Sequence, residues 1–176
     1  SKAKSLNQNG DNETHADEER EEELLEKEEA TEFRAAAARL NFLSQDCPEL
    51  QYPAKEVSQE MAKPKTGAWK RFNRVSRILL GSESVIWEYP WQDEAHEPET
   101  FADSDWGGRR GSRKSTSGGC VMVGSHCIKT WATSQGAVAL SSAEAEFYAM
   151  IEAVMRAKGL LSTMKAMGYP AGSVIR

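Results

Sequence analysis

The sequence has few of the residues that build disulfide frameworks or metal clusters, and it has no long apolar run. Among its 176 residues there are 3 cysteines and 3 histidines. The cysteines form no C-x-x-C pair and are odd in number, which is typical of free thiols in a reducing compartment. No stretch approaches the roughly 18 apolar residues of a membrane span, and none resembles a signal peptide. The composition therefore argues against a secreted disulfide-rich protein and against a membrane protein.

The negative charge of the chain is concentrated at its N-terminus. The net charge is −5 and the mean hydropathy is −0.62. Residues 1–32 carry 12 acidic and 4 basic side chains, so the remainder carries a net +3. A Glu-rich segment with few apolar side chains cannot bury a core. We expect residues 1–30 to form a disordered or frayed helical tail, and the body of the protein to be mildly basic.

Residues 31–81 show helical periodicity in three segments. Apolar side chains recur at helical spacing over 31–45, 52–62 and 66–80. Pro48 and Pro64 follow the first two segments, and Gly81 ends the third. We therefore expect a helical connection region over 31–81.

The third of these helices has one apolar side and one basic side. The apolar stripe consists of Trp69, Phe72, Val75 and Leu79. The other side carries Lys70, Arg74 and Arg77. No acidic residue lies between Lys63 and Gly81, so no negative charge interrupts the basic side. An unbroken basic face indicates an anionic partner, and nucleic acid is the main candidate.

After Gly81 the pattern changes from helical spacing to strand-like runs. Runs rich in β-branched and aromatic residues occupy 84–89, 99–106, 119–123 and 126–131. The last three runs have short connections, which predicts an antiparallel meander. A capping box formed by Ser141 and Glu144 then begins a long helix that ends at Gly168. The fold class is therefore α+β. His126 has no second histidine nearby, so we interpret it as an ordinary strand residue.

Two acidic residues at the end of the 99–106 strand are candidates for a functional site. Asp103 and Asp105 are two residues apart and would share one face of a strand. An isolated pair of this kind is more often a solvated strand end. Glu146 favours a site, because it lies one helical turn before Met150, the first large residue of an apolar stripe. We expect Asp103 and Glu146 to converge across the strand–helix interface and share a divalent cation, with Glu144 in solvent at the helix terminus.

Three blocks of sequence resemble, in order and spacing, the ribonuclease H domain of copia-type retrotransposon polyproteins. They are Ala-Asp-Ser-Asp-Trp-Gly at 102–107, Arg-Lys-Ser-Thr-Ser-Gly at 113–118 and Ala-Leu-Ser-Ser-Ala-Glu-Ala-Glu at 139–146. Residues from about 31 to 89 are similar to the helical connection that follows the reverse transcriptase in these polyproteins. The resemblance covers most of the chain except the acidic tail, and it places the ribonuclease H-like domain at 82–176.

The resemblance implies an activity and a set of site residues. The family hydrolyses the RNA strand of RNA–DNA hybrids by a two-metal mechanism that uses Mg²⁺ or Mn²⁺. Asp103 and Glu146 match its catalytic metal ligands, and Ser141 and Ser142 match positions that contact the hybrid. The remaining candidate nucleic-acid contacts are the basic residues Arg113, Lys114, Lys70, Arg74 and Arg77. The role of Asp105 stays open, and the implied location is cytoplasmic, in virus-like particles, or nuclear.

The chain departs from the family in the number of acidic ligands it supplies. The family's third acid lies on the strand after the long helix, and residues 173–176 match only the start of that strand. We therefore expect a polyprotein fragment that stops before the fourth strand and lacks the third and fourth ligands. Whether it is an enzyme stays open at this stage. One reading is a piece of a ribonuclease H joined to the rest of the Pol polyprotein, including its reverse transcriptase. The alternative is a catalytically dead remnant that acts only as a nucleic-acid-binding or interaction module.

Overall fold

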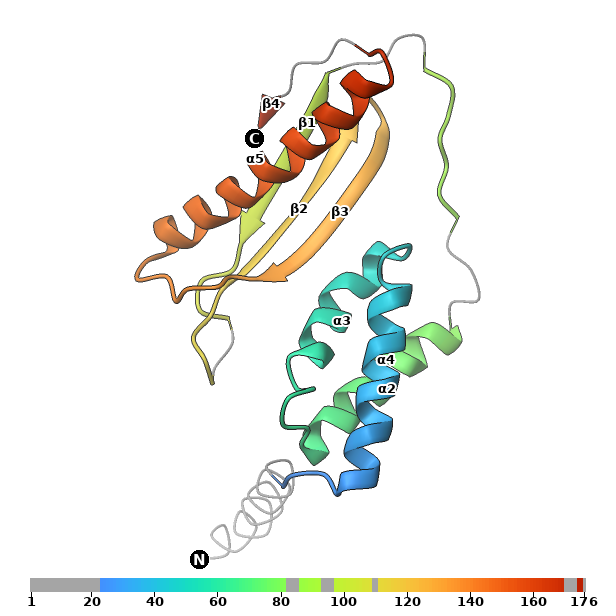
Figure 1. The fold of residues 1–176 in the computed structure, drawn as a ribbon, viewed down its shortest axis with the longest axis vertical. Coiled ribbons are helices and arrows are strands. Elements are labelled where there is room, and N and C mark those ends of the chain that lie inside the picture. Colours follow the sequence, from blue (N-terminus) through green and yellow to red (C-terminus); the bar gives the residue numbers. More distant parts are fainter. Residues whose placement is uncertain (1–22, 82–85, 93–96, 109–110, 170–173, 176) are drawn as a thin grey trace, which may run out of the picture. The chain divides into compact units, whose positions relative to one another are not determined.

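The chain divides into two compact units, residues 1–85 and 86–176, which are described separately (Figure 1). The structure is a computed structural model, and it describes residues 23–81, 86–92, 97–108, 111–169 and 174–175. Most of the expected acidic tail, residues 1–22, lies outside the described residues.

The described residues of the first unit form three α-helices and a short 3₁₀ turn. They are α2 (Lys27–Leu43), η1 (Pro48–Leu50), α3 (Gln51–Ser58) and α4 (Thr66–Gly81). Proline suits the first position of a helical turn, since it has no amide hydrogen to leave unpaired, and Pro48 occupies that position in η1. The prediction of three helices is confirmed. However, α2 begins four residues earlier than expected, within the Glu-rich segment, and α3 ends at Ser58.

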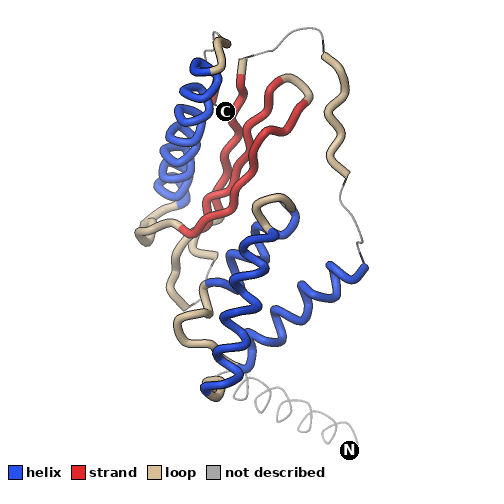
Figure 2. Tube along the Cα trace, turned by 45° about the vertical axis from the view of Figure 1, so that its right-hand side comes forward, coloured by secondary structure: helices blue, strands red, loops and turns tan. Residues whose placement is uncertain are grey.

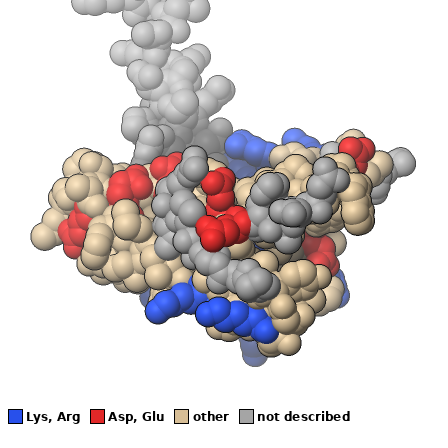
Figure 3. Space-filling view, turned by 90° about the horizontal axis from the view of Figure 1, so that it is seen from above, with Lys and Arg blue, Asp and Glu red and all other residues tan. Residues whose placement is uncertain are grey.

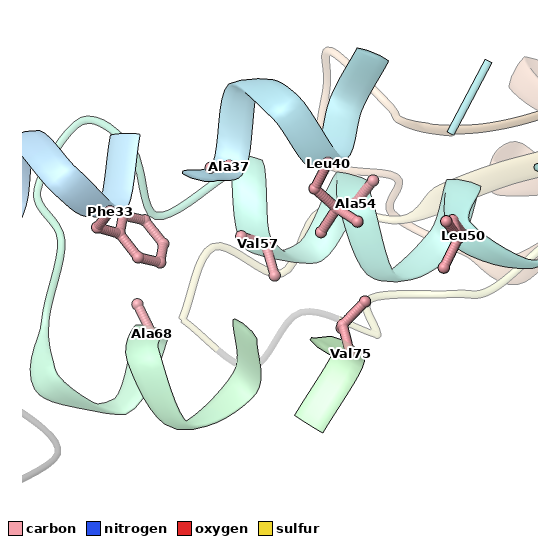
Figure 4. Close-up of a cluster of buried hydrophobic side chains, with 8 residues drawn as sticks. All are labelled: Phe33, Ala37, Leu40, Leu50, Ala54, Val57, Ala68 and Val75. Carbon is pink, nitrogen blue, oxygen red and sulfur yellow. The ribbon is translucent and has the colours of Figure 1, made fainter. Parts of the chain in front are cut away.

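The core of the first unit lies where its helices meet, and its side chains point toward one another (Figure 4). Its buried members are Phe33, Ala37, Leu40, Leu50, Ala54, Val57, Ala68 and Val75. Phe33 and Phe72 each meet the Trp69 ring edge-on, at centroid distances of 5.5 and 5.6 Å. Trp69, Phe72 and Leu79 pack against this core, which confirms the apolar stripe predicted for α4. The basic side of α4 is thereby left on the surface.

The second unit is a four-stranded sheet with one long helix. Its elements are β1 (Pro98–Ser104), β2 (Thr116–Val123), β3 (His126–Ser134), α5 (Ser142–Ala166) and β4 (Val174–Ile175), and the strand order is β3-β2-β1-β4. β1, β2 and β3 are antiparallel, as predicted. β4 pairs in parallel with Glu99 and Thr100. The expectation that the chain stops before the fourth strand is therefore wrong, since two residues of it already join the sheet.

The described part of the strand-like run at 84–89, residues 86–89, does not form a strand. Residues 84 and 85 lie outside the described residues, and residues 86–92 have no regular secondary structure. This segment is held to the β2–β3 hairpin by side chains: Gln92 Nε2 donates to the Val123 carbonyl at 3.0 Å, and His126 Nε2 is 2.6 Å from the Pro90 oxygen. His126 is thus a structural residue of the hairpin, and side-chain bonds replace a β-ladder here.

α5 packs along one face of the sheet (Figure 2). It contacts the sheet through a stripe of small residues. The buried residues of the helix are Ala145, Ala149, Ala153 and Ala157. The apolar stripe expected on this helix is confirmed at Ala153 and Ala157, but two other members of it, Met150 and Met167, are exposed. The expectation that Glu146 points at the core is wrong for the same reason, and Glu146 is exposed. Small side chains let a helix approach the sheet closely, so the alanines rather than the methionines face it.

This corrected orientation predicts that substitutions at two positions of α5 differ in their effect on the free energy of unfolding. Ala153→Leu should lower the free energy of unfolding by about 1–3 kcal/mol, because Ala153 packs against Val121 and Trp131 and leaves no room for a larger side chain. Met150→Ala should change it by less than about 0.5 kcal/mol, because Met150 is exposed. Urea denaturation of the two variants measures both effects. A larger loss for Met150→Ala would restore the orientation predicted from the sequence.

Candidate functional site

The two candidate carboxylates lie at the same end of the second unit. Asp103 is next to the last residue of β1, and Glu146 is in the first turns of α5. A buried side chain ties these regions together: Gln135 Nε2 donates to Ser117 Oγ at 3.0 Å and to the Ala145 carbonyl at 2.8 Å. Ser117 is in turn the cross-strand partner of Ser104. The start of α5 is therefore connected to the end of β1 through Gln135 and Ser117 of β2.

Asp103 does not face α5. Ala102, its neighbour in β1, packs against the cluster that contains Ala153 of α5. Because successive residues of a strand point to opposite faces, Asp103 lies on the face away from the helix. The expected convergence of Asp103 and Glu146 across the strand–helix interface is therefore wrong. Both carboxylates are instead exposed to solvent.

The position of each carboxylate relative to the edge of the sheet follows from the strand order and from the geometry of α5. β4 pairs only with Glu99 and Thr100, so in the described part of the chain no strand borders β1 beside Asp103. On α5, Tyr148 lines a cavity of about 380 Å³ together with Thr133 and other residues of the β3 side. Two residues apart on a helix is about 200° of rotation, so Glu146 lies on the flank away from β3, toward β1. Both acids therefore lie on the β1 side of the unit, but on opposite faces of the sheet.

The N-terminus of α5 is capped as the sequence predicts. Ser141 is the N-cap, and its Oγ accepts a hydrogen bond from the Glu144 amide at 3.2 Å. Glu144 Oε2 accepts from the Leu140 amide at 2.7 Å, and Tyr148 donates to Oε1 at 2.9 Å. The hydrogen bond to the Glu144 carboxylate raises the pKa of Tyr148. Glu144 is thus a half-buried cap rather than a solvated one, while Ser141 and Ser142 are exposed.

The loop between β1 and β2 is tied down at both ends. The Asp105 amide donates to the Thr116 carbonyl at 3.1 Å, and the Thr116 amide donates to Asp105 Oδ1. Inside the loop, the Gly107 amide donates to the buried Ser115 hydroxyl at 3.0 Å. Trp106 Nε1 donates to the Ala139 carbonyl at 3.1 Å and so connects this loop to the segment before α5. Asp105 is half-buried and engaged in the loop, unlike exposed Asp103.

The candidate basic residues lie on the surface of both units. Lys70, Arg74 and Arg77 on α4 are exposed, and so is Arg113, while Lys114 is half-buried. The face drawn in Figure 3 carries acidic as well as basic side chains, so it is not a uniformly basic surface.

Mg²⁺ is usually bound through one or two carboxylates and several waters, so exposed carboxylates such as Asp103 and Glu146 are the donor type that it prefers. However, no group of three or more His, Cys, Asp or Glu side chains gathers among the described residues. The cysteines offer no substitute: Cys47, Cys120 and Cys127 are unbridged, and burial raises the pKa of Cys120 and of Cys127, which disfavours the metal-binding thiolate.

The structural roles of two residues that organise this end of the unit could not be predicted from the sequence, although Trp106 belongs to the 102–107 block. Gln135 and Trp106 bond to partners 10 to 33 positions away along the chain. Neither belongs to a periodic pattern or a short motif with an evident partner. Their roles depend on the strand register, which brings partners that are distant along the chain close together in space.

Comparison with known proteins finds relatives among retroelement sequences. The chain is 30% identical over 122 residues, or 68% of its length, to an uncharacterized mitochondrial protein of Arabidopsis thaliana. It is 28% identical over 140 residues, or 78% of its length, to the retrovirus-related Pol polyprotein from transposon RE2 of the same plant. It is also 32% identical over 110 residues, or 62% of its length, to secreted RxLR effector protein 161 of Plasmopara viticola, of which it covers 77%.

The relatives differ greatly in length from this chain. It spans 50% of the mitochondrial protein and 9% of the Pol polyprotein. No protein-family model matches the sequence, and no solved structure matches it. None of the helices in the described part of the chain combines the length and the apolar character that crossing a bilayer requires.

Proposed function

Because this chain belongs to the Pol polyproteins of copia-type retrotransposons, we propose that its second unit is the first part of a ribonuclease H domain. The complete domain would hydrolyse the RNA strand of RNA–DNA hybrids. The observation that carries the proposal is the placement of two solvent-exposed carboxylates, Asp103 and Glu146, at one end of the β1–α5 layer. An acidic pair at an open sheet edge suits a divalent cation and an extended substrate.

Asp103 and Glu146 would hold Mg²⁺ or Mn²⁺ through their carboxylate oxygens. Such an ion, when bound, stabilises charge on the phosphate and activates water for attack. Two-metal hydrolysis needs ligands for both ions, and the described residues supply fewer than that. We therefore propose that other parts of the Pol polyprotein provide the remaining ligands. This chain contributes the first two acids and the fixed geometry around them.

The nucleic-acid contacts are assigned to exposed groups near these acids and on α4. Ser141 and Ser142 lie at the N-terminus of α5, where a hydroxyl can reach a substrate strand. Arg113 and Lys114 lie in the loop after β1. Lys70, Arg74 and Arg77 form a separate basic segment on the first unit. We place the protein beside the reverse transcriptase in the polyprotein, in the cytoplasmic or nuclear setting where hybrids form.

The test is hydrolysis of a labelled RNA–DNA hybrid by a Pol polyprotein segment that includes this chain, in the presence of Mg²⁺. Cleavage of the RNA strand, with the DNA strand and duplex DNA left intact, is the expected result. Binding of the hybrid without cleavage under all metal conditions would instead support the remnant reading, in which the chain is a nucleic-acid-binding module. Absence of both would reject the proposed function.

Binding should depend strongly on salt and little on sequence. Phosphate contacts by Lys and Arg release counterions, and each contact adds about 0.9 to the slope of log affinity against log salt. Replacing Lys70, Arg74 and Arg77 together by Ala should therefore lower that slope by up to about 3 on duplex or hybrid. Fluorescence anisotropy between 50 and 200 mM salt, about the range over which such effects are largest, measures it. An unchanged slope would remove α4 from the interface.

A further inference from the structure

The end of β1 contains an unusual hydrogen bond that involves Asp105. In an antiparallel ladder, opposite residues alternate between pairs that exchange both backbone N–H···O=C bonds and pairs that exchange none. Asp105 and Thr116 follow directly after the last pair of the β1–β2 ladder, Ser104 and Ser117. The Asp105 amide donates to the Thr116 carbonyl as a ladder pair requires. The return bond, however, goes from the Thr116 amide to Asp105 Oδ1, so a side-chain oxygen accepts where a backbone carbonyl normally does.

Because the side-chain oxygen accepts this bond, the backbone carbonyl of Asp105 is not needed for the ladder, and the chain can turn immediately after Asp105. Asp side chains often accept backbone hydrogen bonds in this way and thereby compete with regular structure. The chain enters the left-handed region at Gly107, where φ is +60°. The Asp105 carboxylate then lies directly against Gly108, where even a Cβ would overlap it. Asp105 therefore closes the ladder and anchors the first turn of the loop at the same time.

The same loop brings a basic side chain back beside the end of β1. The Arg113 guanidinium lies against Gly107, 3.2 Å from where a Cβ of that residue would be. Arg113 itself has a φ of 56°, which places it, unusually for a non-glycine residue, in the left-handed region. Such a conformation persists only where the surrounding structure holds it. Two hydrogen bonds fix this end of the loop. The Thr116 amide donates to the Asp105 carboxylate, and the Gly107 amide donates to the Ser115 hydroxyl.

We propose that Asp105 is a positioning residue, not a metal ligand: its carboxylate closes the 106–115 loop and so holds Arg113 and Lys114 beside the strand end that carries Asp103. The consequence for binding rests on the proposed function, because Arg113 and Lys114 are assigned there as contacts to nucleic acid. The consequence for the loop itself depends only on the hydrogen bonds and close contacts described above.

Two substitutions at Asp105 separate positioning from metal ligation. Asp105→Asn keeps a side-chain oxygen that can accept from the Thr116 amide but removes the charge, whereas Asp105→Ala removes the acceptor. Anisotropy with an RNA–DNA hybrid in EDTA should show that Asp105→Ala weakens binding about 5-fold, close to the effect of replacing Arg113 and Lys114 by Ala. Asp105→Asn should bind within about 2-fold of the unmodified chain. Combining Asp105→Ala with the double replacement should add nothing, because both remove the same contact.

Amide hydrogen exchange measures how firmly the loop is held, and it requires no nucleic acid. The Thr116 and Gly107 amides should exchange faster in Asp105→Ala and remain protected in Asp105→Asn. Gly108→Ala should also release them, because its Cβ meets the Asp105 carboxylate, while Gly111→Ala is the matched control with nothing within 4 Å of its Cβ. If the chain binds no hybrid, the binding part of the proposed function fails, yet these exchange rates still decide the role of Asp105.

A third measurement addresses the competing role directly. Mn²⁺ alone, followed by the loss of its free electron paramagnetic resonance signal, should bind the unmodified chain and Asp105→Asn equally. A loss of Mn²⁺ binding in Asp105→Asn equal to that in Asp103→Asn would overturn the proposal and make Asp105 a ligand. So would unchanged Thr116 exchange in Asp105→Ala, or a binding defect as large in Asp105→Asn as in Asp105→Ala.

Discussion

Asp103→Asn and Glu146→Gln should each abolish hydrolysis of the hybrid by a Pol polyprotein segment that contains this chain, with losses of more than about 100-fold. Replacing even the outer partners of metal ligands typically costs about 10–100-fold, so loss of a ligand itself should cost more. Both substitutions are nearly isosteric and both side chains are exposed, so neither should unfold the protein. The rate of RNA cleavage at fixed Mg²⁺ measures the effect.

Glu144→Gln is the matched control for this experiment. Glutamine serves as well as glutamate in a capping box, so the bond from the Leu140 amide should be kept. Cleavage by Glu144→Gln should therefore stay close to that of the unmodified segment. Activity that survives Asp103→Asn and Glu146→Gln, or that disappears with Glu144→Gln alone, would show that the catalytic carboxylates have been assigned to the wrong residues.

Gly119→Ala should destabilise the second unit by about 3 kcal/mol or more, the largest effect on stability that we expect from a single methyl group. Gly119 pairs across the sheet with Trp131, and a Cβ there would overlap both the Trp131 ring and the Phe101 carbonyl. Overpacking usually costs about 1–3 kcal/mol, and here the backbone neighbour cannot move without breaking the sheet. With a total stability of about 5–15 kcal/mol, such a loss is readily measured.

The neighbouring glycine provides the control for Gly119→Ala. A Cβ at Gly118 would come no closer than 3.9 Å to the Trp131 carbonyl, which is an ordinary contact. Gly118→Ala should therefore be close to neutral. Because the chain has two units, amide exchange of β2 residues during urea unfolding follows the second unit alone. Equal stabilities of the two variants would mean that the Trp131 ring does not lie over Gly119.

Local sequence patterns were sufficient to predict those features of the structure that depend on residues close together along the chain. The apolar stripe of α4 and the capping box at Ser141 and Glu144 each involve residues three or four positions apart, and both were found as predicted. The antiparallel order of β1, β2 and β3 also follows from short connections. The three sequence blocks around Asp103, Arg113 and Glu146 were sufficient to identify the retrotransposon family.

Tertiary contacts decided which way each side chain points, and there the sequence was a poorer guide. Met150 outweighs Ala149 in hydrophobicity, yet the helix must approach a sheet surface that already holds the Trp131 ring, and the fully buried residues of the helix are all alanines. That choice turned Glu146 outward, and the packing of Ala102 on α5 placed Asp103 on the far face. The side-chain hydrogen bonds of Asp105 and Gln135 join residues 10 to 18 positions apart. Spacing alone determined which elements form, but orientation depended on the space left by other elements, which no local pattern records.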